Sequence, residues 1–143
     1  MVLSEKIQDP AIRQQIAADC ATLVDQQVST KKGISGMAVK AAYGVIKGIG
    51  ASYIPGAIER LLPEACSAID PLWTEGVAAG DPVNYLSNHS TRTADSLLGV
   101  TDARLEQSDN TLVCGTYRKL RKSIQGDVEA AVPGLARIIS NYA

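Results

Sequence analysis

Residues 9–33 read DPAIRQQIAADCATLVDQQVSTKKG and carry the signals of one long amphipathic helix. Apolar residues recur there at steps of three and four, which places them on one face of an α-helix. Asp9 suits the N-cap, Pro10 the first turn and Gly33 the position after the last turn. We predict a helix from about Pro10 to Lys31. Its buried face would comprise Ile12, Ile16, Cys20, Leu23, Val24 and Val28.

The same helical spacing continues through the rest of the chain. No stretch shows sustained alternation of apolar and polar residues with β-branched enrichment, so we expect no sheet. The sequence therefore predicts an all-α protein, a compact bundle of six to eight helices in a single domain over residues 1–143. We expect a kink or break at Pro71, an interruption near Gly99 and a turn at Gly126. The later helices are expected at residues 36–49, 55–62, 63–80, 82–107 and 111–124, with a last one after Pro133.

The stretch 36–49 is apolar over most of its circumference and predicts the central, most buried helix. Its Gly44-x-x-x-Gly48 spacing would let a neighbouring helix approach closely. A membrane-surface role is not expected, because the apolar surface is too wide and the cationic face too thin for a typical anchor. The apolar residues are Met37, Ala38, Ala41, Ala42, Val45, Ile46 and Ile49.

A weak internal repeat links the two halves of the chain. Ile54-Pro55-Gly56-Ala57 resembles Val132-Pro133-Gly134-Leu135, Tyr43 resembles Tyr117, and Asp25 resembles Asp102. The offsets are 78, 74 and 77 residues. We predict a duplication with halves at about 9–80 and 81–143, related by a pseudo-twofold axis.

Charge is zoned along the chain although the net charge is only −1. No acidic residue lies between Asp25 and Glu59, or between Asp109 and Asp127. These two acid-free zones occupy equivalent places in the repeat and suggest a site for an anionic ligand. Nucleic-acid binding is not expected, because the chain lacks Phe and any recognised reading motif. The candidate ligand-binding residues are Lys40, Lys47, Arg118, Arg121 and Lys122.

Composition argues against most site chemistry. The single His excludes a two-His metal site, and three scattered Cys do not form the paired pattern of structural zinc. We expect no catalytic residue, metal or cofactor, and we expect the cysteines to be small buried hydrophobes. A small enzyme using Asp102, Glu106 or His89 stays open as an alternative. No secretory signal is expected in MVLSEKIQDP, which points to a cytoplasmic protein.

These observations favour a non-enzymatic binding or structural module. A further alternative is a scaffold that docks another chain, or a homo-oligomer. In that case the aliphatic residues Leu135, Ile138 and Ile139 of the last helix would be exposed for docking.

Three segments resemble an uncharacterised family of small helical bacterial proteins of unknown function. They are Gly33-Ile34-Ser35-Gly36 with Val39-Lys40-Ala41-Ala42-Tyr43, then Pro55 with Arg60-Leu61-Leu62-Pro63, and then Val100-Thr101-Asp102-Ala103-Arg104. The resemblance extends over almost the whole chain. It implies a compact helical protein and no activity, cofactor, partner or site residue.

Overall fold

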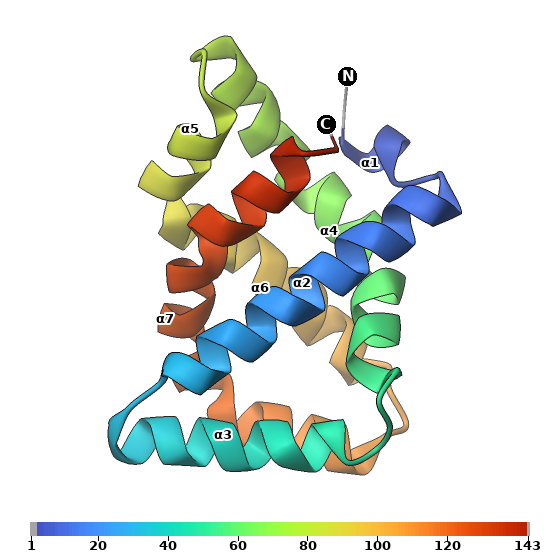
Figure 1. Cartoon of the computed structure of the whole chain (residues 1–143), viewed down its shortest axis with the longest axis vertical. Coiled ribbons are helices and arrows are strands. Elements are labelled where there is room, and N and C mark those ends of the chain that lie inside the picture. The colour runs from blue at the N-terminus through green and yellow to red at the C-terminus, as the bar shows by residue number, and fades with distance from the viewer. Residues whose placement is uncertain (1–2, 143) are drawn as a thin grey trace.

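A computed structural model describes residues 3–142, with every side chain in that range except that of Ser35. Seven helices and no strand occur among these residues, which confirms the predicted all-α fold (Figure 1). The helices are α1 (Leu3–Lys6), α2 (Pro10–Thr30), α3 (Gly33–Lys47), α4 (Tyr53–Ala78), α5 (Pro82–Asn88), α6 (Ser90–Glu106) and α7 (Thr111–Ser140).

The helix starts that the sequence predicts after Asp-Pro pairs are present. The Asp9 carboxylate accepts a hydrogen bond from the Ala11 amide at 2.9 Å and caps α2. The Asp81 carboxylate accepts from the Asn84 amide at 3.1 Å and caps α5. α2 ends at Thr30 with Lys31 as its C-cap, so Gly33 is the first residue of α3 rather than the residue after the last turn of α2. Gly33 has φ +79°, a left-handed conformation that favours glycine, and it lies where the chain turns from α2 into α3.

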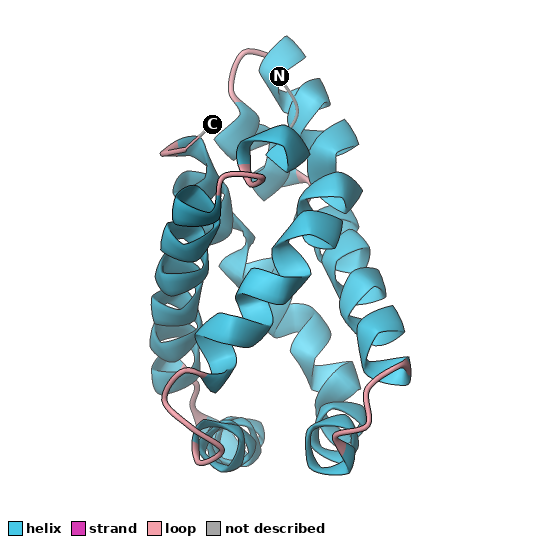
Figure 2. Ribbon diagram, turned by 90° about the vertical axis from the view of Figure 1, so that its right-hand side faces the viewer, coloured by secondary structure: helices cyan, strands magenta, loops and turns pink. Residues whose placement is uncertain are grey.

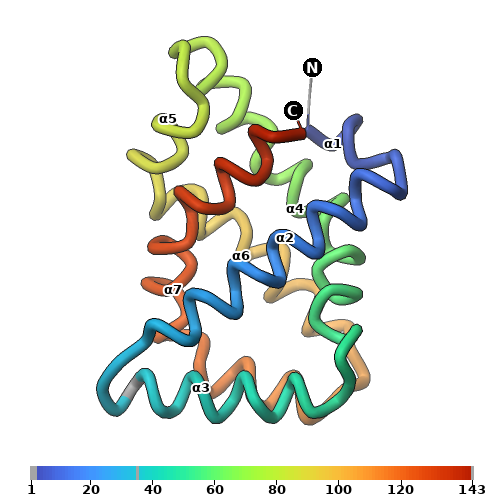
Figure 3. The backbone as a smooth tube through the Cα atoms, in the orientation of Figure 1, coloured from blue at the N-terminus to red at the C-terminus, as the bar shows by residue number. Residues whose placement is uncertain are grey.

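The helix boundaries that the sequence indicated at Pro63 and Gly126 are absent, because α4 and α7 are each one longer helix. α4 continues through Pro63 and Pro71, and α7 continues through Gly126 and Pro133. A proline inside a helix removes one backbone hydrogen bond and bends the helix. Both helices bury apolar side chains on either side of a proline or close to one, from Leu62 to Trp73 in α4 and from Val132 to Ile139 in α7, so tertiary packing holds them together. α7 changes direction, running first along one end of the molecule and then up its side (Figure 3).

The predicted helix 82–107 is interrupted at His89 rather than at Gly99. His89 has φ −118° and ψ 40°, outside the helical region, and it separates α5 from α6. Its ring stacks on Tyr85 with 4.2 Å between centroids, and its Nδ1 lies 2.7 Å from the Tyr85 carbonyl oxygen. These two contacts stabilise the turn, although histidine is not a residue type that typically ends a helix.

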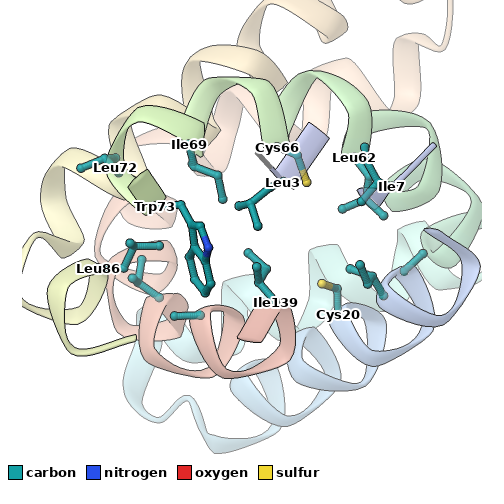
Figure 4. Packing of buried hydrophobic residues seen from close by; sticks show 14 residues of the cluster. Leu3, Ile7, Cys20, Leu62, Cys66, Ile69, Leu72, Trp73, Leu86 and Ile139 are labelled. Carbon is teal, nitrogen blue, oxygen red and sulfur yellow. The ribbon is translucent and has the colours of Figure 1, made fainter. Parts of the chain in front are cut away.

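The packed core lies at the end of the molecule that holds both termini, and we call this the core end. The Trp73 indole lies between Leu86 and Ile139 in Figure 4, with Ile69 beside it. α1, which the sequence did not predict, adds Leu3 to this cluster, and the turn that follows it adds Ile7. The cluster comprises Leu3, Ile7, Ile16, Ala17, Cys20, Leu62, Cys66, Ile69, Leu72, Trp73, Leu86, Val132, Ala136 and Ile139.

The prediction that the helix at 36–49 is central and most buried is wrong. α3 lies at the opposite end of the molecule, beside the first half of α7 (Figures 1 and 2). Met37 is 72% exposed and Val45 48% exposed, whereas Val39 on the inner side is buried. A Cβ added at Gly44 would meet no atom within 4 Å, so no neighbour approaches there. Hydropathy predicted burial, but the other helices cover only one face of α3.

We use the term base for residues 32–49 and 111–125, which comprise α3 with its flanking residues and the first half of α7. No helix among residues 3–142 combines the length and the apolar character needed to cross a bilayer.

Candidate functional site: an apolar cavity above the base

An apolar cavity of about 420 Å³ lies between the base and the packed core. Five helices surround it, namely α2, α3, α4, α6 and α7, and apolar side chains dominate its wall. The size falls in the range of small-molecule binding sites. The wall includes Leu23, Val24, Val28, Val39, Ala42, Ile46, Ile58, Leu61, Ala65, Leu97, Val100, Leu120, Ile124, Val128, Ala131 and Leu135.

The cavity exists because its wall consists of small and aliphatic side chains. The chain contains no Phe, and its single Trp is used in the core end. Tyr43 is the one aromatic residue that lines the cavity among the described residues. Protein interiors normally have few voids larger than a water molecule. A space of this size with an apolar wall has the dimensions and the lining of a small-molecule site.

A second hollow, of about 450 Å³, adjoins the apolar cavity and is more polar. Ile46, Ile58, Leu61 and Thr101 line both spaces, so the two are neighbours. Two arginines, Arg60 of α4 and Arg104 of α6, line the second hollow.

The two arginines differ in how they are bonded. Arg104 donates to the Arg60 carbonyl oxygen at 2.8 Å and lies 3.4 Å from the Glu64 carboxylate. Within residues 3–142 the Arg60 guanidinium has no ion-pair partner. The second hollow thus has an uncompensated cation at its edge, next to an apolar cavity.

Two similar polar clusters tie the base helices to the rest of the bundle. In the first, Tyr43 and Lys47 of α3 both bond Asp25 of α2, with Lys47 Nζ 3.2 Å from the carboxylate. Hydrogen bonds from Tyr43 and Lys47 hold the pKa of Asp25 below its ordinary value. This cluster fixes one side chain of the cavity wall, Tyr43, against α2.

In the second cluster, Tyr117 and Arg121 of α7 bond Asp102 of α6. Tyr117 Oη lies 2.6 Å from the carboxylate, and Arg121 donates to it through Nε at 2.9 Å and Nη2 at 3.1 Å. The Arg121 hydrogen bond is the main cause that lowers the pKa of Asp102, and the Tyr117 hydroxyl adds to it. Two parallel hydrogen bonds make this the more specific of the two contacts.

The chain matches a family of unknown function, DUF6918, over residues 3–143. It belongs to this family. Neither a curated protein nor a solved structure matches the chain. Membership of DUF6918 therefore assigns no activity to the chain.

The five cations predicted for an anionic ligand in this DUF6918 protein lie on the two base helices, but none of them lines the apolar cavity. Asp25 and Asp102 already neutralise Lys47 and Arg121. Lys40, Arg118 and Lys122 are exposed. A third hollow, of about 340 Å³, is lined by Arg118 and Arg121 together with two carboxylates, which reduces its attraction for an anion.

Of the residues considered for a small enzyme, Asp102 and Glu106 both line the third hollow, whereas His89 does not. His89 is bonded to the carbonyl oxygen of Tyr85 at the α5–α6 junction, and Asp102 is bonded by Tyr117 and Arg121. Glu106 is exposed and lines the third hollow. No group of three metal-ligating side chains occurs in the described part of the chain.

The three cysteines are free and buried, as the sequence predicted. Burial raises the pKa of the Cys20 and Cys66 thiols to about 12, so both are protonated at neutral pH. A protonated, buried thiol is a weak nucleophile, which agrees with a packing role.

The predicted docking face on the last helix is wrong. Ile139 is buried, and Leu135 and Ile138 pack against the core cluster. The bend of α7 turns these side chains inward, where Leu135 also reaches the wall of the cavity.

Arg60 and Arg104 were absent from the predicted site. One signal in the sequence pointed to Arg60, because the repeated Pro-Gly segment is followed by an arginine in both halves. No pattern in the sequence predicted the cavity, since the cavity depends on how five helices pack.

Proposed function

We propose that this protein is a non-enzymatic binding module for a small amphiphile with an apolar chain and an anionic group. The observation that carries the proposal is the apolar cavity of about 420 Å³, which adjoins a hollow lined by Arg60 and Arg104. A straight-chain carboxylate has the chemistry that these two spaces offer.

The apolar part of the ligand would gain from the cavity wall. Each buried CH₂ group is worth about 0.8 kcal/mol, so a chain of several methylenes binds appreciably before any polar contact is made. A preformed cavity also avoids the free-energy cost of ordering a site on binding.

The anionic part of the ligand would be placed by Arg60. Its guanidinium is uncompensated within residues 3–142 and can form two parallel hydrogen bonds to a carboxylate. Arg104 is held in place by the Arg60 carbonyl oxygen and Glu64, so it adds positive charge at a fixed position. The predicted set Lys40, Lys47, Arg118, Arg121 and Lys122 lies outside the cavity wall, so the geometry favours Arg60 for the ligand.

The test is a calorimetric titration with straight-chain carboxylates and with alcohols of the same chain length. We expect saturable binding that strengthens with chain length until the cavity is full, and tighter binding of the carboxylate than of the alcohol. Ala131→Leu, which places a larger side chain in the cavity wall, should abolish binding of both. Arg60→Gln should weaken the binding of the carboxylate by about tenfold or more and leave the binding of the alcohol unchanged.

Arg137→Gln is the matched control, because Arg137 is also an exposed arginine without an ion-pair partner in the described residues and it lines neither space. It should bind both ligands as the wild type does. The proposal is overturned if no ligand binds, or if Ala131→Leu binds both ligands as tightly as the wild type.

A further inference from the structure

We infer that the base is an interaction surface that docks onto a bilayer containing anionic lipids. The inference does not depend on occupancy of the cavity, because it rests on the outer surface of α3 and of the first half of α7.

The first observation is the exposed apolar row on the outside of α3. Ile34, Met37, Ala41 and Val45 follow one another at steps of three and four residues and therefore share one face of the helix. Ile34 is 88% and Met37 72% exposed, which is unusual for large apolar side chains on one helix face.

Exposed apolar side chains are concentrated at the base. Six large apolar side chains are exposed among the described residues, and five of them belong to the base. The sixth is Val77 in the last turn of α4. The C-terminal end of α4 lies away from the base, near the other end of the molecule (Figure 1). The five are Ile34, Met37, Val45, Ile49 and Leu112.

The second observation is the charge of the same surface. The base contains seven Lys and Arg residues and no acidic residue, although the chain as a whole carries −1. Eight Lys and Arg side chains have no ion-pair partner in residues 3–142, and five of these belong to the base. The five are Lys32, Lys40, Arg118, Lys119 and Lys122.

Together these features match the requirements of a bilayer surface. A helix that lies in the interface places its apolar face among the acyl chains and its cations among the headgroups. α3 runs along the edge of the molecule, with the first half of α7 beside it, so both helices could meet one plane (Figure 2). A second copy is disfavoured as the occupant, because a symmetric contact would bring two acid-free, cationic surfaces together.

The test is co-sedimentation with vesicles of phosphatidylcholine alone and of phosphatidylcholine mixed with phosphatidylglycerol. We expect binding to the mixed vesicles only, and we expect it to weaken as salt is raised. Met37→Glu combined with Val45→Glu should abolish binding. Lys119→Gln combined with Lys122→Gln should weaken it by about twenty-five-fold, since each cation near an anionic surface contributes about fivefold.

The chain supplies a matched control for each variant. Val77→Glu changes an exposed apolar residue away from the base and should bind as the wild type does. Lys6→Gln combined with Arg137→Gln removes two unpaired cations on α1 and the last turn of α7, and should also have no effect. Ala131→Leu should still bind vesicles, which separates this inference from the proposed function.

Three results would overturn the inference. One is no binding to either type of vesicle. Another is equal loss of binding in the base variants and in their controls. The third is a lipid-free dimer in analytical ultracentrifugation that Met37→Glu with Val45→Glu dissociates, because this would assign the apolar row to a second copy.

Discussion

The core end and the cavity wall are built partly from the same helices but are filled differently. α2, α4 and α7 contribute side chains both to the packed cluster and to the cavity wall. At the core end Trp73, Leu86 and Ile69 fill the space between them, whereas small residues such as Ala42, Ala65 and Ala131 face the cavity. The difference indicates that the core end supplies most of the stability of the fold, whereas the side chains around the cavity leave space between them.

The largest expected effect compares one leucine from each region. Leu86→Ala removes a fully buried side chain and should lower the free energy of unfolding by roughly 2–5 kcal/mol. Leu120→Ala enlarges a space that already exists and should lower the free energy of unfolding by less than about 1.5 kcal/mol. Urea denaturation measures both values, and equal losses would show that the cavity wall is packed like the core.

The next comparison enlarges one alanine of α7 in each region. Ala136 is fully buried at the core end, and Ala136→Leu should destabilise the fold by about 1–3 kcal/mol through overpacking. Ala131 lines the cavity, and Ala131→Leu should be neutral or stabilising, because the added carbons enter empty space. Thermal unfolding separates the two outcomes. A lower Tm for Ala131→Leu than for Ala136→Leu would argue against the cavity.

Two glycines give a smaller contrast. An alanine Cβ at Gly76 would lie 2.7 Å from the Pro82 Cα atom, so Gly76→Ala must displace backbone and should destabilise the fold. Gly44→Ala meets no atom within 4 Å in a helix interior and should stabilise the protein by about 0.5–1 kcal/mol. Chemical denaturation of the two variants measures the change in the free energy of unfolding. A loss of stability in Gly44→Ala would indicate that Gly44 is buried against a neighbouring helix, as the sequence suggested.

The smallest expected effect concerns the loss of folding stability at acidic pH. The pKa of Asp25 and of Asp102 is lowered in the folded state, so the unfolded chain binds more protons on acidification. The stabilisation from these carboxylates is therefore present above their unfolded pKa and is lost as the pH falls through the folded value. Asp25→Asn with Asp102→Asn should flatten this acid limb of a plot of stability against pH. An unchanged limb would contradict the role of the two clusters.

Much of the fold could be predicted from the sequence because its signals are local. The cap at Asp9, the apolar row of α2 and the turn at Gly33 depend on neighbouring residues alone. Continuity through Pro71 and Pro133 could not be predicted in this way, since distant side chains hold those helices together. The break at His89 likewise depends on its contact with Tyr85.

The candidate site was much less predictable. Hydropathy placed α3 at the centre because it reports composition, not which face other helices cover. The internal repeat stays a prediction, although its aligned pairs, Asp25 with Asp102 and Tyr43 with Tyr117, occupy similar hydrogen-bonded clusters. The two base helices are therefore alike on the faces that contact the rest of the bundle, whereas their outer faces differ. α3 exposes Met37 and Val45 there, and the first half of α7 exposes Lys119 and Lys122.

The binding role of the cavity is tested most directly by methyl NMR of the labelled protein during titration with a straight-chain carboxylate. We predict saturable shifts of the methyl signals of Val39, Ile46 and Leu97, with those of Ile69 and Leu86 unchanged. Signals that stay still throughout, or that move equally at both ends of the molecule, would contradict the proposed ligand site.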